Sequence, residues 1–147
     1  MANVERRAHV VWEGDLARGN GTLTEDSSGA LSDAPVTWAS RVERPDGKTS
    51  PEELIAAAHA SCYSMALSHT LAEGGNAPER LEVEAVCTFD DEALKITTVD
   101  LNVRGRVPGI GSEEEFENAA HQADQGCPVS NALRGNVEIR VQTILEG

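Results

Sequence analysis

The sequence predicts an α+β fold, and two kinds of pattern predict it. Residues 81–89 and 137–145 alternate apolar and polar side chains, which is typical of half-buried strands. Segments that follow Ser50 and Ser112 carry helix-capping signals and many apolar side chains. The predicted order is strands, a long helix, two strands, two helices and a final strand, which indicates an α+β class.

The composition favours one folded domain over residues 1–147. Apolar residues make up 39% and charged residues 25% of the 147 residues, so a folded core is feasible. Aromatic residues are only 3%, and Leu, Val, Ile and Ala must therefore fill that core. A chain of this length buries a modest share of its surface, so a dimer would help. The net charge of −13 argues against nucleic acid and anionic membrane surfaces as partners.

The sequence predicts a cytoplasmic protein. The first 15 residues lack an apolar stretch long enough for a signal peptide. The most apolar region, residues 54–71, is interrupted by histidines and serines, which excludes a membrane-spanning helix. Structural disulfides are rare in the cytosol, so the three cysteines are expected to be catalytic, metal-binding or buried thiols.

The N-terminal part is predicted to form a hairpin and a short strand. Residues 10–12 and 21–24 are the arms of the hairpin, and its turn-rich connection carries Arg18. Residues 25–50 are rich in Ser, Asp, Gly and Pro, and they contain one short strand at residues 36–39.

A long buried helix is predicted next. Ser50 is a good N-cap, Pro51 suits the first helical position, and Glu53 completes a capping box. The helix should run to about residue 72, because Gly74 and Gly75 follow. Its residues are apolar on nearly all sides, which is typical of a buried helix.

The C-terminal part is predicted to contain a hairpin, two helices and a last strand. The apolar face of the first strand includes Cys87, and the second strand, residues 94–104, changes its apolar parity between Ile96 and Val99, which suggests a bulge. A helix begins at Ser112 and ends at residue 126. A short helix then begins at Cys127 and precedes the strand at residues 137–145.

The three cysteines differ in their surroundings. Cys62 lies in the middle of the buried helix, where a thiol is often only a small apolar core residue. Cys127 lies at a helix N-cap, where backbone N–H groups and the helix dipole stabilise a thiolate, although a simple turn explains it equally well. Cys87 is expected to be a buried structural thiol.

Other polar residues admit alternatives. His59 and Cys62 are three residues apart on one helix, so half of a metal site is conceivable, but no common zinc spacing is present. His59 could instead tune the thiol or bind a backbone group in the core. Glu52 can be explained by a favourable interaction with the helix dipole, and Arg18 can be explained as a solvated loop residue.

Four segments resemble the osmotically inducible protein C family, which includes the organic hydroperoxide resistance proteins. SPEELIAAAHASCYSMALS at residues 50–68 resembles the first cysteine motif of the family, and GCPVSNAL at residues 126–133 resembles the second. VPGI at residues 107–110 and WEGDLARGNG at residues 12–21 are similar to the osmotically inducible branch.

The resemblance implies a peroxidase that reduces hydroperoxides, especially organic ones. It implies that Cys62 is the peroxidatic cysteine, Cys127 the resolving cysteine, and Arg18 and Glu52 the active-site arginine and glutamate. It implies an intertwined α+β homodimer, with central long helices wrapped by mainly antiparallel sheets. No bound cofactor is implied, and the expected reductant is an external dithiol of the lipoyl type.

This chemistry suits the residue types. A thiolate that attacks a peroxide becomes a sulfenic acid, and a second thiol then condenses with it to form a disulfide. Glu52 and Cys62 are ten residues apart on one helix, or about 15 Å along its axis. We therefore expect Arg18 and Glu52 to reach Cys62 from a partner subunit. The alternatives are a non-catalytic stress or small-molecule binding protein on the same fold, and a metal-binding protein.

Overall fold

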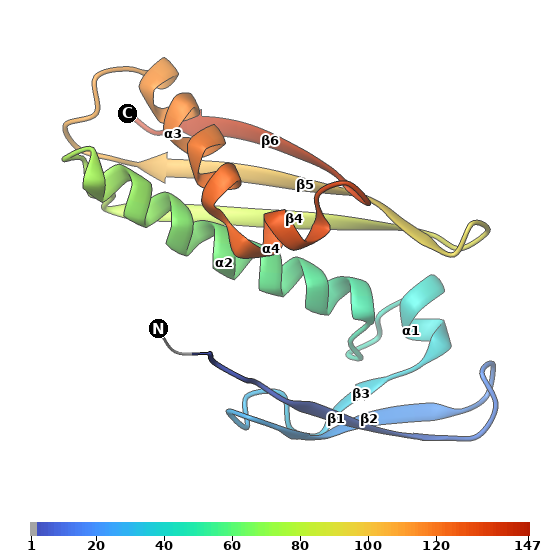
Figure 1. The fold of residues 1–147 in the computed structure, drawn as a ribbon. Helices are drawn as coiled ribbons and strands as arrows, with labels where there is room; N and C mark the ends of the chain where they lie inside the picture. Colours follow the sequence, from blue (N-terminus) through green and yellow to red (C-terminus); the bar gives the residue numbers. More distant parts are fainter. Residues whose placement is uncertain (1–2) are drawn as a thin grey trace. The chain divides into compact units, whose positions relative to one another are not determined.

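The computed structural model describes residues 3–147 and confirms the predicted α+β class. The chain divides into two compact units, of which the first ends at Leu54 and the second begins at Ile55. In chain order the elements are β1 to β3, α1, α2, β4, β5, α3, α4 and β6 (Figure 1). Each unit contains one three-stranded sheet.

The first unit contains an antiparallel sheet and a short helix. Strands β1 (Ala8–Glu13) and β2 (Asn20–Asp26) form the predicted hairpin, and β3 (Ala34–Val36) pairs with β2. The strand predicted at residues 36–39 is instead the end of β3 followed by α1 (Trp38–Val42). The physical reason is a capping box, because the side chains of Thr37 and Ser40 each accept a hydrogen bond from the other residue's backbone N–H.

The long helix α2 (Pro51–Glu73) matches its predicted extent. Its N-cap is confirmed, since the Ser50 hydroxyl accepts a hydrogen bond from the backbone N–H of Glu53 at 3.1 Å. The Glu53 carboxylate accepts from the Thr49 hydroxyl at 2.7 Å, which is a variation on the predicted capping box. No helix within residues 3–147 combines the length and the apolar character that crossing a bilayer requires.

The second unit contains the sheet formed by β4 (Arg80–Asp90), β5 (Lys95–Arg106) and β6 (Glu138–Leu145). Strand β5 is central, antiparallel to β4 and parallel to β6. The predicted bulge is present at Thr97, which has no partner in the β4–β5 ladder. Helices α3 (Glu113–Gly126) and α4 (Pro128–Leu133) form the crossover that a parallel pair needs.

The core of the second unit lies between its sheet and its helices. The helices cover one face of the β4–β5–β6 sheet (Figure 1). The core is formed mostly by aliphatic side chains of α2 and β5 with one ring from α3: Tyr63, Leu67, Leu71, Val99, Leu101, Val103 and Phe116. Cys127 belongs to the same cluster and is fully buried, so the start of α4 is docked against this core.

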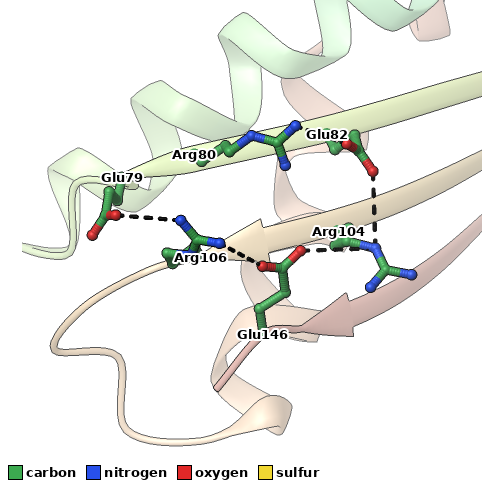
Figure 2. A network of polar contacts seen from close by, with 6 residues as sticks. All are labelled: Glu79, Arg80, Glu82, Arg104, Arg106 and Glu146. Atoms are coloured by element: carbon green, nitrogen blue, oxygen red, sulfur yellow. Dashed lines mark hydrogen bonds and ion pairs between the residues drawn. The ribbon is translucent and has the colours of Figure 1, made fainter.

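The opposite face of that sheet is polar. Figure 2 shows a chain of ion pairs at one end of the sheet, in which Glu146 lies between Arg104 at 3.8 Å and Arg106 at 3.2 Å. Arg104 also approaches Glu82 of β4 at 3.9 Å, and Arg106 approaches Glu79 at 3.5 Å. Exposed ion pairs of this kind contribute little to stability individually. We interpret this face of the sheet as a solvent-exposed surface.

Candidate active site

The two cysteines predicted to react, Cys62 and Cys127, are neighbours in the second unit. Cys62 lies in the middle of α2 and is half-buried, whereas Cys127 is fully buried between α3 and α4. Their thiols interact with one another, and both are free thiols in this structure. The two thiols are therefore neighbours in the folded second unit.

The position of Cys127 is set by the start of α4. Cys127 is the N-cap of this helix, as predicted, and its Sγ atom accepts a hydrogen bond from the backbone N–H of Ser130 at 3.5 Å. Pro128 occupies the first helical position, where it lacks only an N–H that would be unpaired in any case. The sequence CPVS thus places a sulfur at the end of a helix that presents free N–H groups.

The surroundings of Cys62 within one chain favour the thiol over the thiolate. Burial raises the pKa of the Cys62 thiol, the backbone N–H of Val129 lowers it, and the neighbouring Cys127 thiol raises it further. The net direction is upward from an ordinary value of 9.0. A thiolate at neutral pH therefore needs a further positive charge near Cys62.

A buried polar pair lies next to the cysteines. Nε2 of His59 lies 2.7 Å from the Ser130 hydroxyl, and both side chains are completely buried. Burial lowers the pKa of His59, the charge of Asp124 opposes this shift, and that of Arg134 reinforces it. His59 is therefore neutral near pH 7, and its contact with Ser130 is a hydrogen bond between neutral groups.

Glu52 lies in the first unit, at the start of α2, and it binds an arginine. Arg41 of α1 donates from Nε to Oε1 at 3.0 Å and from Nη2 to Oε2 at 2.9 Å, which forms a bidentate pair. Glu52 is only 7% exposed, so the carboxylate is held in one orientation. The arginine that Glu52 binds within one chain is Arg41, whereas the resemblance implies Arg18 as the active-site arginine.

Arg18 lies in the connection between β1 and β2. Its backbone N–H donates to the Oδ1 atom of Asp15 at 2.7 Å, which stabilises the turn. Arg41 lies within residues 25–50, whose composition predicts mostly irregular structure, so its pairing with Glu52 does not follow from the sequence pattern. The signal that could have identified it is the Thr37 N-cap, which predicts a short helix and places Arg41 in its last turn.

An apolar cleft of about 360 Å³ lies beside this pair in the first unit. Its walls include Trp12, Leu16, Leu23, Trp38 and Leu54, together with Arg41. The Arg41 guanidinium also lies 5.8 Å from the centre of the Trp38 ring, a cation–π contact that orients it further. A fixed cation at the edge of an apolar cleft suits a ligand with one polar end and one apolar end.

Cys87 and the possible metal ligands complete the set of candidates. Cys87 lies on β4 and packs against the core of the second unit, but it is only half-buried, whereas the sequence predicted a buried thiol. Across residues 3–147, no group of three or more His, Cys, Asp and Glu side chains is arranged to hold a metal ion.

Comparisons with known proteins agree with the resemblance seen in the sequence. The family model described as OsmC-like protein matches residues 44–142. The chain is 38% identical over 141 residues to Peroxiredoxin OsmC of Escherichia coli (strain K12), covering 95% of this chain and 96% of that protein. It is 31% identical over 103 residues to Organic hydroperoxide resistance protein-like 1 of Staphylococcus epidermidis, covering 67% of this chain and 72% of that protein.

Solved structures share the fold. The OsmC-like protein from Mycoplasma pneumoniae superposes with a TM-score of 0.71 at 13% identity, over 99% of this chain and 100% of that one. The organic hydroperoxide resistance protein OhrB of Bacillus subtilis gives a TM-score of 0.65 at 24% identity, over 94% and 98% of the two chains. With a family match over most of its length and a relative at 38% identity, the chain belongs to the OsmC-like protein family.

Proposed function

We propose that this protein is a thiol-dependent peroxidase that reduces organic hydroperoxides, and hydrogen peroxide less well. The observation that carries the proposal is the pair of neighbouring thiols, Cys62 in the middle of α2 and Cys127 at the N-cap of α4. Cysteine-based peroxidase is also the enzyme class to which the relatives named peroxiredoxin and organic hydroperoxide resistance protein point.

The reaction has two steps on the protein. The Cys62 thiolate attacks the distal peroxide oxygen, the O–O bond breaks, and the released alkoxide takes a proton to leave as an alcohol. Cys62 is then a sulfenic acid. The Cys127 thiol attacks its sulfur, the S–S bond forms, and the S–O bond breaks to release water. An external dithiol, for which a lipoyl-type compound is the expected chemical class, reduces the disulfide and returns both thiols.

Arg41 takes the role that the resemblance assigned to Arg18. Cys62 needs a cation to ionise, because burial and Cys127 raise its pKa within one chain. Arg41 is held by the nearly buried Glu52, so its charge is fixed in place rather than mobile in solvent. The same guanidinium can donate to the peroxide oxygens as negative charge develops on them. The adjoining apolar cleft accounts for a preference for organic over inorganic hydroperoxide.

The arginine and glutamate reach Cys62 from a second copy of the chain. Glu52 and Cys62 are ten residues apart on α2, and a helix rises about 1.5 Å per residue, or about 15 Å over that interval. Glu52, which binds Arg41, is therefore separated along α2 from the Cys62 of the same chain. A homodimer with shared active sites resolves this separation, and it agrees with the expected benefit of a dimer for so short a chain.

Steady-state consumption of cumene hydroperoxide, with dihydrolipoamide as reductant, tests this function. Cys62→Ser should lower the rate at least about a hundredfold, because the attacking atom is gone. Cys127→Ser should still consume the first equivalent but lose turnover with the dithiol. Cys87→Ser is the matched control and should keep the wild-type rate. Full activity of Cys62→Ser would overturn the proposal and return the protein to a binding role.

A further inference from the structure

The first turn of α4 provides backbone N–H groups to both cysteines. The N–H of Ser130 donates to the Cys127 Sγ atom at 3.5 Å, and the N–H of Val129 acts on Cys62 through a hydrogen bond that lowers its pKa. Two consecutive N–H groups therefore face the two sulfurs. Helix α4 has only six residues, which is too short to be stable by itself, so other contacts must fix its position.

Helix α4 is attached to its neighbours at both ends. At its C-cap, Arg134 donates to the Asp124 carboxylate at 3.2 Å and to the Asp124 carbonyl at 3.0 Å, which ties the helix to α3. In its first turn, the Ser130 hydroxyl bonds Nε2 of His59 at 2.7 Å, which ties it to α2. This second contact joins residues that are 71 positions apart in the sequence, and it lies in the turn that faces the sulfurs.

His59 links α2 to the first turn of α4, so the position of that turn depends on α2. It precedes Cys62 by three residues and so lies about one helical turn away on the same side of α2. The ring is neutral, and a hydroxyl can both donate and accept, so either tautomer can bind Ser130. Both partners are fully buried, and loss of one would leave the other without a partner, which is costly in a protein interior.

We propose that His59 is a positioning residue of the redox pair: by binding Ser130 it fixes the first turn of α4 and so holds Cys127 where it can attack oxidised Cys62. This inference rests on the proposed function. Cys62 belongs to α2 itself and keeps its place when the link is cut, whereas Cys127 depends on α4. The effect therefore falls mainly on disulfide formation, because small displacements of a reacting atom lower rates steeply.

A single-turnover experiment with one equivalent of cumene hydroperoxide separates the two steps. Dimedone labels the sulfenic acid on Cys62, and mass spectrometry follows the Cys62–Cys127 disulfide. Ser130→Ala and His59→Leu should slow disulfide formation by about tenfold and increase dimedone labelling, while the first oxidation changes much less. His59→Gln should restore most of the rate, because its amide can reach the Ser130 hydroxyl.

Tyr63→Phe is the matched control. It removes a buried hydrogen bond of 2.8 Å from α2 to the Ala120 carbonyl of α3 but keeps the His59–Ser130 bond, so disulfide formation should slow much less than in Ser130→Ala. Thermal unfolding curves identify a temperature at which all variants are folded, and the rates are compared there. If His59→Leu does not fold, the rate of disulfide formation in Ser130→Ala tests the inference. Wild-type rates in Ser130→Ala, or equal slowing in Tyr63→Phe, would overturn the inference. A wild-type protein that is not oxidised at all would instead contradict the proposed function.

Discussion

The proposed reactivity of Cys62 requires a nearby cation, because the groups that act on it within the second unit favour the thiol. Burial and the Cys127 thiol raise its pKa above 9.0, and the single backbone N–H of Val129 opposes them only in part. Below that pKa the group is mostly a thiol, and the thiol is a poor nucleophile. The proposed Arg41 charge must therefore lower the pKa by stabilising the thiolate, and its removal should raise the pKa again.

This reasoning gives a prediction for the pH dependence of Cys62 alkylation. In a protein that keeps Cys62 as its sole cysteine, Arg41→Ala should move the midpoint of iodoacetamide labelling to higher pH, because burial of the thiol is then no longer opposed by the guanidinium charge. Reduction of hydroperoxide near pH 7 should fall by at least about tenfold, since one pKa unit is a tenfold change in thiolate. Arg18→Ala is the control and should leave the midpoint in place. A midpoint that moves in Arg18→Ala but not in Arg41→Ala would instead identify Arg18 as the active-site arginine.

At the residue scale, the sequence was informative where a motif surrounds the residue. Cys62, Cys127 and Glu52 each lie inside a long motif, and the predicted N-cap position of Cys127 is confirmed. Arg41 lies in a stretch whose helix depends on a capping box between Thr37 and Ser40, which lacks the usual Glu or Gln at the third position. Its pairing with Glu52 is a tertiary contact, which local patterns do not encode.

At the scale of elements, α3 packs on the sheet through one close approach. A Cβ atom at Gly105 of β5 would lie 2.5 Å from the ring of Phe116 on α3, a distance that real contacts do not reach. Gly105 thus lets the buried ring rest directly on the strand backbone. Helix α3 leads into Cys127, so this contact also supports the position of the redox pair.

Gly105→Ala should therefore destabilise the protein by about 1–3 kcal/mol, the usual cost of overpacking a core. Urea unfolding measures the change as a lower midpoint. Gly126→Ala is a suitable control, because a Cβ atom there meets nothing within 4 Å, and alanine favours the helix. Equal stability of Gly105→Ala and the wild type would mean that α3 shifts freely on the sheet, contrary to this account.

The elements themselves were largely predictable, and their pairing was less so. The two serine N-caps and the bulge at Thr97 follow from local chemistry and from a change in apolar parity, and all are confirmed. The parallel pairing of β6 with β5 was not predicted from the chain's pattern. The alternation of apolar and polar residues in β6 identifies a strand with one buried face. Which strand β6 pairs with, and in which direction, depends on how α3 and α4 pack.

At the scale of the whole molecule, shared active sites predict complementation between inactive chains. A hybrid of a Cys62→Ser chain and an Arg41→Ala chain should contain one site with both defects and one intact site. Two differently tagged chains, co-expressed and purified through both tags, should thus regain about half of the wild-type hydroperoxide turnover, because one of two sites is intact.

The control for this experiment is a hybrid of two differently tagged Cys62→Ser chains, which should remain inactive. If each chain instead builds its own site, both sites of the mixed hybrid carry a defect. A mixed hybrid as inactive as its parents would therefore contradict the shared site, while leaving the roles of the cysteines intact.

The most direct measurement is a count of thiols after reaction with one equivalent of cumene hydroperoxide per reduced chain, with peptide mapping of the product. The chain has three cysteines, and we predict that one alcohol forms, two thiols disappear and the disulfide joins Cys62 to Cys127, with Cys87 still free. Three remaining thiols with no alcohol formed, or a disulfide that includes Cys87, would contradict the account.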